Sequence, residues 1–184
     1  MRMHKIFDIE RYRPSKGERF MFDTNIWMYI FCPIGNYREH IVQRYSSFLG
    51  EAINTKAEII INSLILSEFI NSYLRLEFKI FKIRNPNAEF KKDFRKNSSY
   101  KRITQNISSA SKNILKISKG VDDKFSSIDI ESIISEFEKQ NLDFNDLYYQ
   151  EYCKIGKVKI VTDDKDFKYA DTEIITGNPR ILEG

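Results

Sequence analysis

Residues 20–31 read FMFDTNIWMYIF and place one carboxylate, Asp23, between two apolar runs. The run before the acid is short, which is typical of a strand buried on both faces. An acid that directly follows such a strand lies at its carboxyl end, the edge at which open parallel sheets bind their ligands. Asp23 could instead cap a helix that begins near Thr24, an ordinary position for Asp. The stretch therefore predicts a buried strand over residues 19–22 and makes Asp23 a candidate site residue.

The segment VKIVTDD, residues 158–164, predicts a second strand that ends in acids. Its β-branched residues favour a strand. Asp163 and Asp164 come directly after Thr162, and Asp166 lies two positions beyond Asp164. These acids could form a solvated turn, but the strand before them favours a site. Because carboxyl ends of parallel strands meet at one edge of a sheet, we expect them near the end of the first strand.

Two further acids lie near the starts of helices. Glu68 is one turn into the helix that follows a strand in AEIIINS, residues 57–63. Asp146 opens the helix of DFNDLYYQEYCKIGK, residues 143–157. Glu68 could be a solvated helix residue, although its apolar neighbours predict partial burial, and an unpaired buried Glu is costly. Asp146 could be a helix cap. We expect both to converge with the acids that follow the strands.

Several carboxylates in one pocket repel each other and are costly to desolvate, so a protein keeps them together with cations or protons. We expect no His or Cys among the ligands, and His4 and His40, which lie outside the acidic segments, are interpreted as surface residues. Hard oxygen ligands favour Mg²⁺ or Mn²⁺ over zinc. The acids therefore predict a site for a divalent cation.

The remaining pattern predicts an α/β fold with crossover connections, in which helices cover a central parallel sheet in three α/β/α layers. Residues 1–184 are expected to form a single domain, with a helical basic insertion at about residues 80–125. Apolar spacing predicts helices and one last strand at the following positions: helices over residues 38–54, 63–81, 129–140 and 143–156, and a strand over residues 173–176.

The composition is that of a globular chain. Its 30 Lys and Arg residues exceed its 26 Asp and Glu residues and leave a formal charge of +4, which suits a polyanionic partner. Cys32 and Cys153 are far apart and form no CxxC pair, so neither a zinc knuckle nor a disulfide framework is indicated. No segment has the pattern of a signal peptide or of a membrane span. We expect a cytoplasmic protein with no membrane association.

The insertion is the most basic part of the chain. Aromatic residues Phe81, Phe90, Phe94 and Tyr100 alternate with its Lys and Arg residues. Such a segment can bind phosphates and stack bases, although the same aromatic residues could pack a small core instead. The candidate RNA-binding residues are Lys91, Lys92, Arg95, Lys96, Lys101 and Arg102.

Four segments resemble, in this order, the acidic motifs of PIN-domain nucleases. They are FDTNIW (22–27), LSEFIN (66–71), FNDLYYQEYC (144–153) and IVTDDKDF (160–167). Each motif alone is weak, but four in order are specific. The resemblance implies that Asp23, Glu68, Asp146 and Asp164 are the catalytic metal ligands. It adds Asp166 as an accessory ligand or orienting group, whereas Asp163 occupies a variable position. Asn25 and Thr162 are placed to orient the acids by hydrogen bonds.

The resemblance implies an enzyme that cleaves single-stranded or structured RNA by metal-activated water, with Mg²⁺ or Mn²⁺ as cofactor. It suggests the toxin of a bacterial toxin/antitoxin pair, with a cognate antitoxin and a second copy of the chain as partners. A catalytically silent PIN-like module that binds RNA or protein is the alternative. A phosphatase of the haloacid dehalogenase type is disfavoured, because its DxD pair would need Asp at position 25, where the chain has Asn25.

Overall fold

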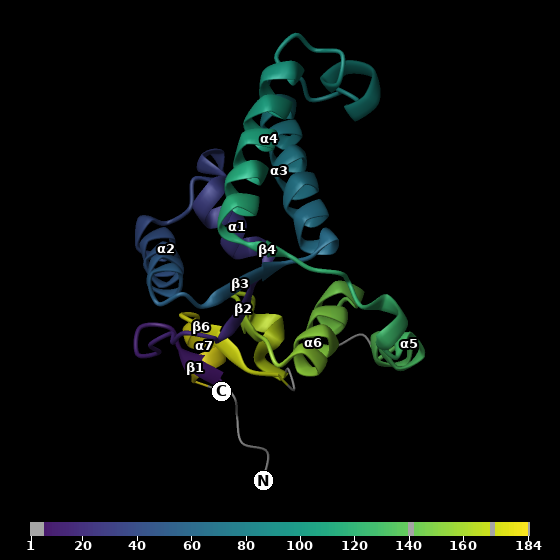
Figure 1. Ribbon diagram of the computed structural model, residues 1–184. Helices are drawn as coiled ribbons and strands as arrows, with labels where there is room; N and C mark the ends of the chain where they lie inside the picture. The colour runs from purple at the N-terminus through teal and green to yellow at the C-terminus, as the bar shows by residue number, and fades with distance from the viewer. Residues whose placement is uncertain (1–5, 140–141, 170–171, 184) are drawn as a thin grey trace.

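The computed structural model describes residues 6–139, 142–169 and 172–183. Within them, six strands form one sheet in the order β1-β6-β5-β2-β3-β4 (Figure 1). Every pair of neighbouring strands is parallel, as predicted. The strands are β1 (Ile6–Asp8), β2 (Arg19–Phe22), β3 (Glu58–Ile61), β4 (Lys119–Gly120), β5 (Lys159–Val161) and β6 (Ile174–Thr176).

Strand β2 lies in the middle of the sheet because its sequence can be buried on both faces. Phe20, Met21 and Phe22 are at most 1% exposed. Its neighbours β3 and β5 supply further β-branched residues, including Ile60 and Ile160, which are also buried. A continuous apolar run of this kind fits a parallel sheet covered by helices on both sides.

The helices form the outer layers. The α-helices are α1 (Thr24–Phe31), α2 (Glu39–Asn54), α3 (Ser63–Arg84), α4 (Tyr100–Ile117), α5 (Ile130–Phe137), α6 (Phe144–Gly156) and α7 (Pro179–Leu182). Shorter turns are η1 (Pro33–Gly35), the π-helical η2 (Phe90–Phe94), η3 (Phe125–Ser127) and η4 (Lys165–Tyr169). From β2 to β4 the chain crosses the sheet in one direction, and from β4 to β5 it returns. Right-handed crossovers therefore put α1 to α4 on one face and α5 and α6 on the other, which confirms the three-layer α/β/α fold.

Helices α3 and α4 pack against each other and project beyond the sheet (Figure 1). We call residues 75–117, the outer part of α3 with η2 and α4, the arm. Its tip has an aromatic core around Phe94, which is fully buried. The Phe94 ring lies 5.3–5.5 Å from the rings of Phe78, Phe81, Phe90 and Tyr100. The aromatic residues of the predicted insertion therefore pack together in a small core of their own. The single-domain organisation of residues 1–184 stays a prediction.

Some elements differ from the predictions. Strands β1 and β4 were not predicted. All three residues of β1 are half-buried and both residues of β4 are exposed, so neither strand forms an apolar run in the sequence. The predicted strand at 158–164 ends at Val161, and its acids lie in the following loop. The predicted helix at 129–140 corresponds to α5, which starts after its cap Asp129 and ends at Phe137. Residue 140 lies outside the described residues.

Candidate active site

The candidate site lies where the strand order reverses. Strands β2 and β5 are neighbours, with Phe22 opposite Val161. From β2 the chain proceeds towards β3, and from β5 it proceeds the opposite way towards β6. Ligands of open α/β sheets bind in the crevice at the carboxyl ends of two such strands. Asp23 follows β2 and Thr162 follows β5, so both lie at this crevice.

Asp23 is buried at 8% exposure and its two carboxylate oxygens have different partners. Oδ1 accepts a hydrogen bond from the backbone N–H of Thr24 at 2.6 Å, as the cap of α1. Oδ2 accepts from the Thr162 hydroxyl at 2.7 Å and from Asn25 Nδ2 at 2.6 Å. The cap and the candidate ligand are thus the same residue. The predicted pair Asn25 and Thr162 has the geometry needed to orient it.

The loop after β5 connects the acids of this strand to Asp23. The Thr162 hydroxyl that donates to Asp23 accepts from the backbone N–H of Asp164 at 3.0 Å. Asp164 Oδ1 in turn accepts from the backbone N–H of Asp166 at 3.0 Å. Asp164 is half-buried and Asp166 is exposed. Thr162 therefore sets the spacing between Asp23 and Asp164.

Asp163 has a different environment from its neighbours. Its Oδ1 accepts from the Tyr45 hydroxyl at 2.8 Å and its Oδ2 from the Tyr29 hydroxyl at 3.0 Å. Its backbone carbonyl accepts from Asn178 Nδ2 at 2.6 Å. Asp163 thus ties the loop to α1, to α2 and to the segment after β6. Sequence reasoning missed these three partners, because the two tyrosines are far from Asp163 in the chain and Asn178 belongs to no pattern.

Glu68 and Asp146 face the site from α3 and α6. Glu68 Oε2 accepts from the Tyr149 hydroxyl at 3.0 Å, a contact that the sequence did not predict. The cap of α6 is Asp143, whose Oδ1 accepts from the backbone N–H of Asp146 at 3.0 Å. The interpretation of Asp146 as the cap is therefore wrong. Asp146 takes part in the cap through its backbone N–H, so its carboxylate is not used for capping.

The acids interact electrostatically across the site. The pKa of Asp23 is raised to about 7, mainly by burial and also by the charges of Glu68 and Asp164, while the hydrogen bond from Thr162 opposes the shift. Burial also raises the pKa of Asp146 to about 8, with contributions from the charges of Asp143, Asp23, Asp164 and Glu68. The charges of Glu68 and Asp164 thus act on both Asp23 and Asp146, and the convergence of the four acids on one metal site stays a prediction.

The donor chemistry of these acids fits a hard divalent cation, because all four offer carboxylate oxygens and their mutual repulsion favours a positive charge. Within residues 6–139, 142–169 and 172–183, no three His, Cys, Asp or Glu side chains already form a group that could hold a metal ion. The carboxylates would therefore have to draw together on binding.

The family model for the PIN domain matches residues 20–173. The chain belongs to the PIN-domain family. This confirms the family resemblance of the four acidic segments, all of which lie inside the matched range. PIN domains are generally nucleases, which supports a hydrolase. No curated protein matches the chain.

Two solved structures share the PIN fold of this chain. VapBC2 from Rickettsia felis, solved bound to a DNA fragment from its promoter, has 17% identity and a TM-score of 0.54. That match covers 87% of this chain and 98% of the other. PAE2754 from Pyrobaculum aerophilum has 11% identity and a TM-score of 0.51, covering 94% and 92% of the two chains. At these identities the matches establish the fold alone.

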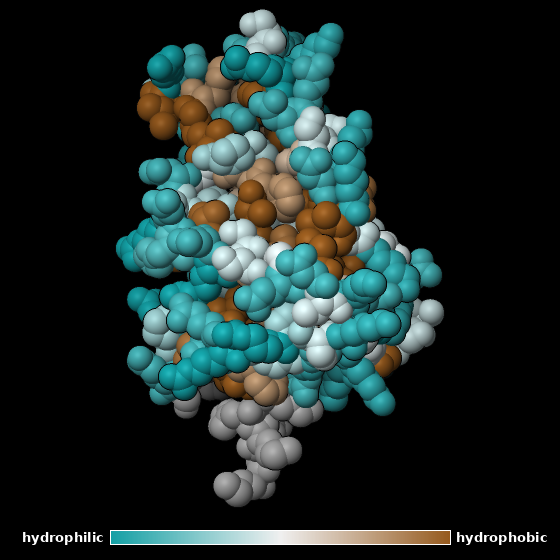
Figure 2. Space-filling view, turned by 60° about the vertical axis from the view of Figure 1, so that its left-hand side comes forward, coloured by the Kyte–Doolittle hydropathy of each residue, from teal (hydrophilic) through white to brown (hydrophobic). Residues whose placement is uncertain are grey.

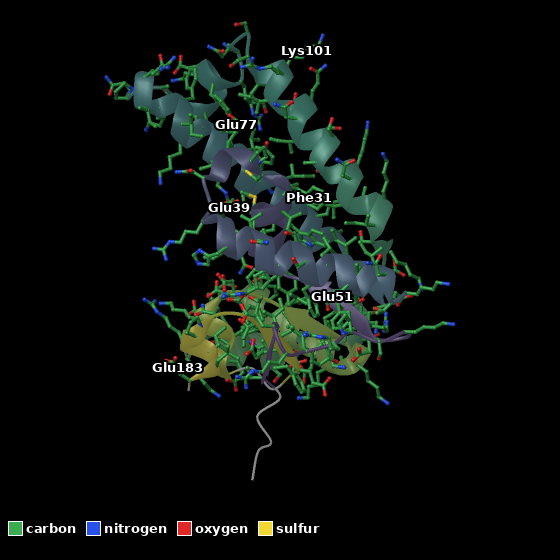
Figure 3. All side chains as sticks on the ribbon, turned by 90° about the vertical axis from the view of Figure 1, so that its left-hand side faces the viewer. Phe31, Glu39, Glu51, Glu77, Lys101 and Glu183 are labelled. Carbon is green, nitrogen blue, oxygen red and sulfur yellow. The ribbon has the colours of Figure 1, made fainter. Side chains whose placement is uncertain are left out.

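The predicted RNA-binding residues lie away from the acids of this PIN domain. Lys91, Lys92, Arg95 and Lys96 belong to η2 and the turn after it, and Lys101 and Arg102 begin α4, so all six lie near the tip of the arm. Lys101 is labelled at the top of Figure 3. Helix α3 carries the chain from Glu68 to its end at Arg84, which is about 24 Å at the helical rise per residue. Contact between these six residues and RNA stays a prediction.

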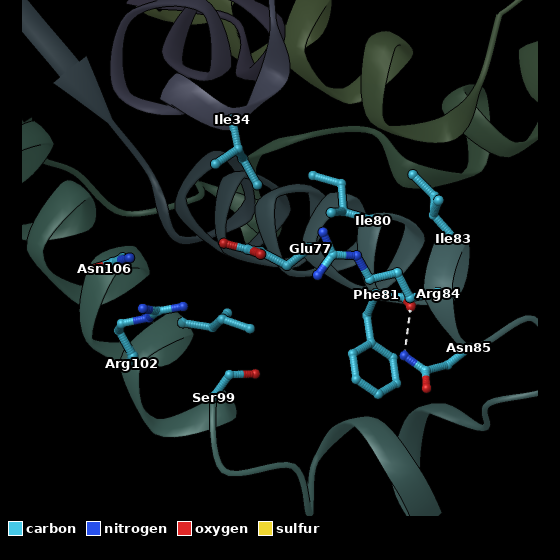
Figure 4. Close-up of a pocket in the computed structure, with 11 residues that line it drawn as sticks. Ile34, Glu77, Ile80, Phe81, Ile83, Arg84, Asn85, Ser99, Arg102 and Asn106 are labelled. Carbon is cyan, nitrogen blue, oxygen red and sulfur yellow. Dashed lines mark hydrogen bonds between the residues drawn. The ribbon is translucent and has the colours of Figure 1, made fainter.

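A cavity of about 740 Å³ lies between α3 and α4 (Figure 4). Its wall is largely apolar and includes Ile80, Phe81 and Ile103. Burial raises the pKa of Glu77 in this wall, and the nearby charge of Arg102 opposes that shift. In Figure 2, hydrophobic residues gather on the upper half of the molecule, the height at which the arm projects in Figure 1. None of the four acids lines this cavity, so it is not the candidate active site.

In the part of the chain that the structure describes, no helix has both the length and the apolar character needed to span a membrane.

Proposed function

We propose that this PIN domain is a metal-dependent endoribonuclease that cleaves single-stranded RNA. The observation that carries the proposal is the electrostatic coupling among Asp23, Glu68, Asp146 and Asp164, which come from four separate segments of the chain. These four acids would hold Mg²⁺ or Mn²⁺, with Asp166 as an accessory ligand next to Asp164. A protein has little reason to bury acids that repel one another unless a cation offsets their charge.

In this proposal each residue has a defined task. Asn25 and Thr162 hold Oδ2 of Asp23, and Tyr149 holds Oε2 of Glu68. Asp146, whose pKa is raised to about 8, keeps a proton at neutral pH until it acts as a ligand, when it must release it. A bound divalent cation supplies a water of lowered pKa and offsets the charge of the leaving oxygen.

The proposed activity predicts that purified protein cleaves single-stranded RNA in the presence of Mg²⁺ or Mn²⁺ and is inactive in EDTA. Readdition of Mg²⁺ after EDTA should restore cleavage, which is measured on a labelled RNA separated by gel electrophoresis. RNA binding without cleavage under any of these conditions would favour the silent PIN-like module instead. A panel of structured RNAs on the same gel tests whether base-paired substrates are also cut.

The role of Tyr149 gives a second prediction. Tyr149→Phe removes the hydroxyl that donates to Glu68 but keeps the buried ring. Loss of such a supporting hydrogen bond typically lowers metal affinity about 10-fold or more. Titration of Mg²⁺ by isothermal calorimetry measures the change. The matched control is Tyr152→Phe on the same helix, because Tyr152 is equally buried and none of the four acids acts on its pKa. Equal affinities in both variants would remove Tyr149 from the site.

We further propose that the protein is a cytoplasmic toxin with a cognate antitoxin and that it forms a homodimer. The support is the family membership together with the fold that it shares with VapBC2 from Rickettsia felis. Co-expression with the product of the adjacent gene, followed by size-exclusion chromatography with light scattering, tests both partners. A lone monomer that does not inhibit growth when expressed would contradict this part of the proposal.

A further inference from the structure

A second pocket, with a volume of about 560 Å³, opens directly beside the candidate active site. Asn25 and Asp164 line it on the side of the site. Its other walls come from the start of α2, from η4 and from α7. His40 and four Arg or Lys residues also line it, and we call it the cationic pocket after the latter four: Arg38, Arg44, Lys165 and Arg180.

Three of these four cationic side chains are not neutralised by an acid among the described residues. Among the described residues, Arg38, Lys165 and Arg180 form no ion pair, and all three are exposed. Asp163, the second acid of the pocket wall, is already held by two tyrosine hydroxyls. Positive charge is therefore available in the pocket wall.

Arg44 is fixed in place and forms the rigid part of the wall. Its Nε donates to Glu10 Oε1 at 2.9 Å and its Nη1 to the carbonyl of Gly177 at 3.0 Å. The side chain packs so closely on Gly177 that a Cβ at that position would lie 2.3 Å from Arg44 Cδ. A larger residue at 177 would therefore displace the Arg44 side chain, and the hydrogen bond from Arg44 to Gly177 holds the segment after β6 against α2 at the pocket.

We propose that the cationic pocket binds a phosphate of the RNA strand adjacent to the phosphate that is cleaved. This inference rests on the proposed function, because it assumes that the acids face the scissile phosphate. A polyanion approaching four carboxylates is repelled, and cations a few ångströms away offset that repulsion. Arg side chains bind phosphate oxygens with paired N–H groups, whereas Lys supplies a point charge.

The location of the pocket favours it over the arm as the first site of phosphate binding. The pocket shares Asn25 and Asp164 with the site itself, whereas the basic tip of the arm is about 24 Å from Glu68 along α3. In Figure 3, Glu39, next to Arg38, and Glu183, just after α7, lie on the same side of the molecule. Lys101 lies at the far end from Glu183 in that view. A short RNA bound at the acids can therefore reach the pocket but not the tip of the arm.

The test uses a fluorescently labelled RNA trinucleotide, which is too short to span from the acids to the tip of the arm. Binding is measured by anisotropy at low ionic strength in EDTA, so that metal-dependent cleavage does not interfere. The double variant Arg38→Gln/Arg180→Gln should raise Kd about 10-fold, and the slope of log K against log salt should fall by about 0.7 for each phosphate that is no longer neutralised. Lys165→Gln, a single exposed substitution, should raise Kd in the same direction even if the double variant does not fold.

The matched control is Lys91→Gln/Lys96→Gln at the tip of the arm, which removes the same charge and should leave Kd of the trinucleotide within about twofold of wild type. Wild-type affinity in the pocket variants, an equal loss in the arm control, or no binding by the wild-type protein would each overturn the proposal. Tighter binding of poly-glutamate than of RNA, abolished in the pocket variants, would reassign the pocket to an acidic protein. Binding through the pocket without any RNA cleavage would refute the proposed activity alone.

Discussion

Asp23→Asn is expected to reduce Mg²⁺-dependent RNA cleavage by at least about 100-fold, because loss of a direct ligand should exceed the effect of losing a supporting partner. The variant keeps an oxygen that can accept from Thr24 N–H, so the cap of α1 survives. It replaces the other oxygen, which accepts from Asn25 and Thr162, by an amide that cannot be a ligand. Cleavage rates under single-turnover conditions measure the loss.

The matched control for this experiment is Asp122→Asn. Asp122 is an exposed acid that follows β4 at the same edge of the sheet, and it does not act on the pKa of Asp23. Its replacement should leave cleavage close to the wild-type rate. If Asp23→Asn retains Mg²⁺-dependent activity while its circular dichroism spectrum is native, Asp23 is not a metal ligand and the proposed site is wrong.

The sequence predicted the centre of the fold because local patterns determine it. The buried run before Asp23 and the β-branched run before Thr162 each define a strand, and no other strand separates them in the sheet. Acids at the ends of adjacent parallel strands must lie close together, whatever the rest of the chain does. The outer strands β1 and β4 could not be predicted, since each is short and is defined as a strand by its pairing with the neighbouring strand, β6 or β3.

The surroundings of the acids could not be predicted, because they depend on side chains that only the tertiary fold brings together. Asp163 looks like one more acid of the motif, yet Tyr29 and Tyr45 bind it. Arg38 and Arg180 are ordinary surface residues in the sequence and become neighbours of the site through the positions of α2 and α7. The basic residues of the insertion are recognisable in the sequence because they lie in one stretch of the chain. The residues of the cationic pocket come from separate segments, so no single stretch of sequence predicts it.

The second large effect concerns stability without metal. The pKa of Asp23 is raised to about 7 and that of Asp146 to about 8, mainly by burial, from an ordinary value of 3.8. Between about pH 4 and pH 8 the folded chain therefore binds more protons at these groups than the unfolded chain, so stability falls as pH rises. One pKa unit corresponds to about 1.4 kcal/mol, and the loss between pH 5 and pH 8 should be at least about 3 kcal/mol.

Urea denaturation in EDTA at pH 5, 6.5 and 8 measures this loss, and Mg²⁺ should restore stability at pH 8 because it binds only the folded chain. Asp146→Asn should be more stable than wild type by about 1–2 kcal/mol at pH 8 and no more stable at pH 4, since it removes a half-buried charge that exists only at the higher pH. The stabilising pair of Glu18 with Lys159 does not interfere, because the pKa of Glu18 is lowered to about 2 and it stays ionised throughout this range. A free energy of unfolding that is constant or rises from pH 5 to pH 8 would show that the pKa values of Asp23 and Asp146 are not raised in the folded chain, and the electrostatic argument for a cation at these acids would be lost.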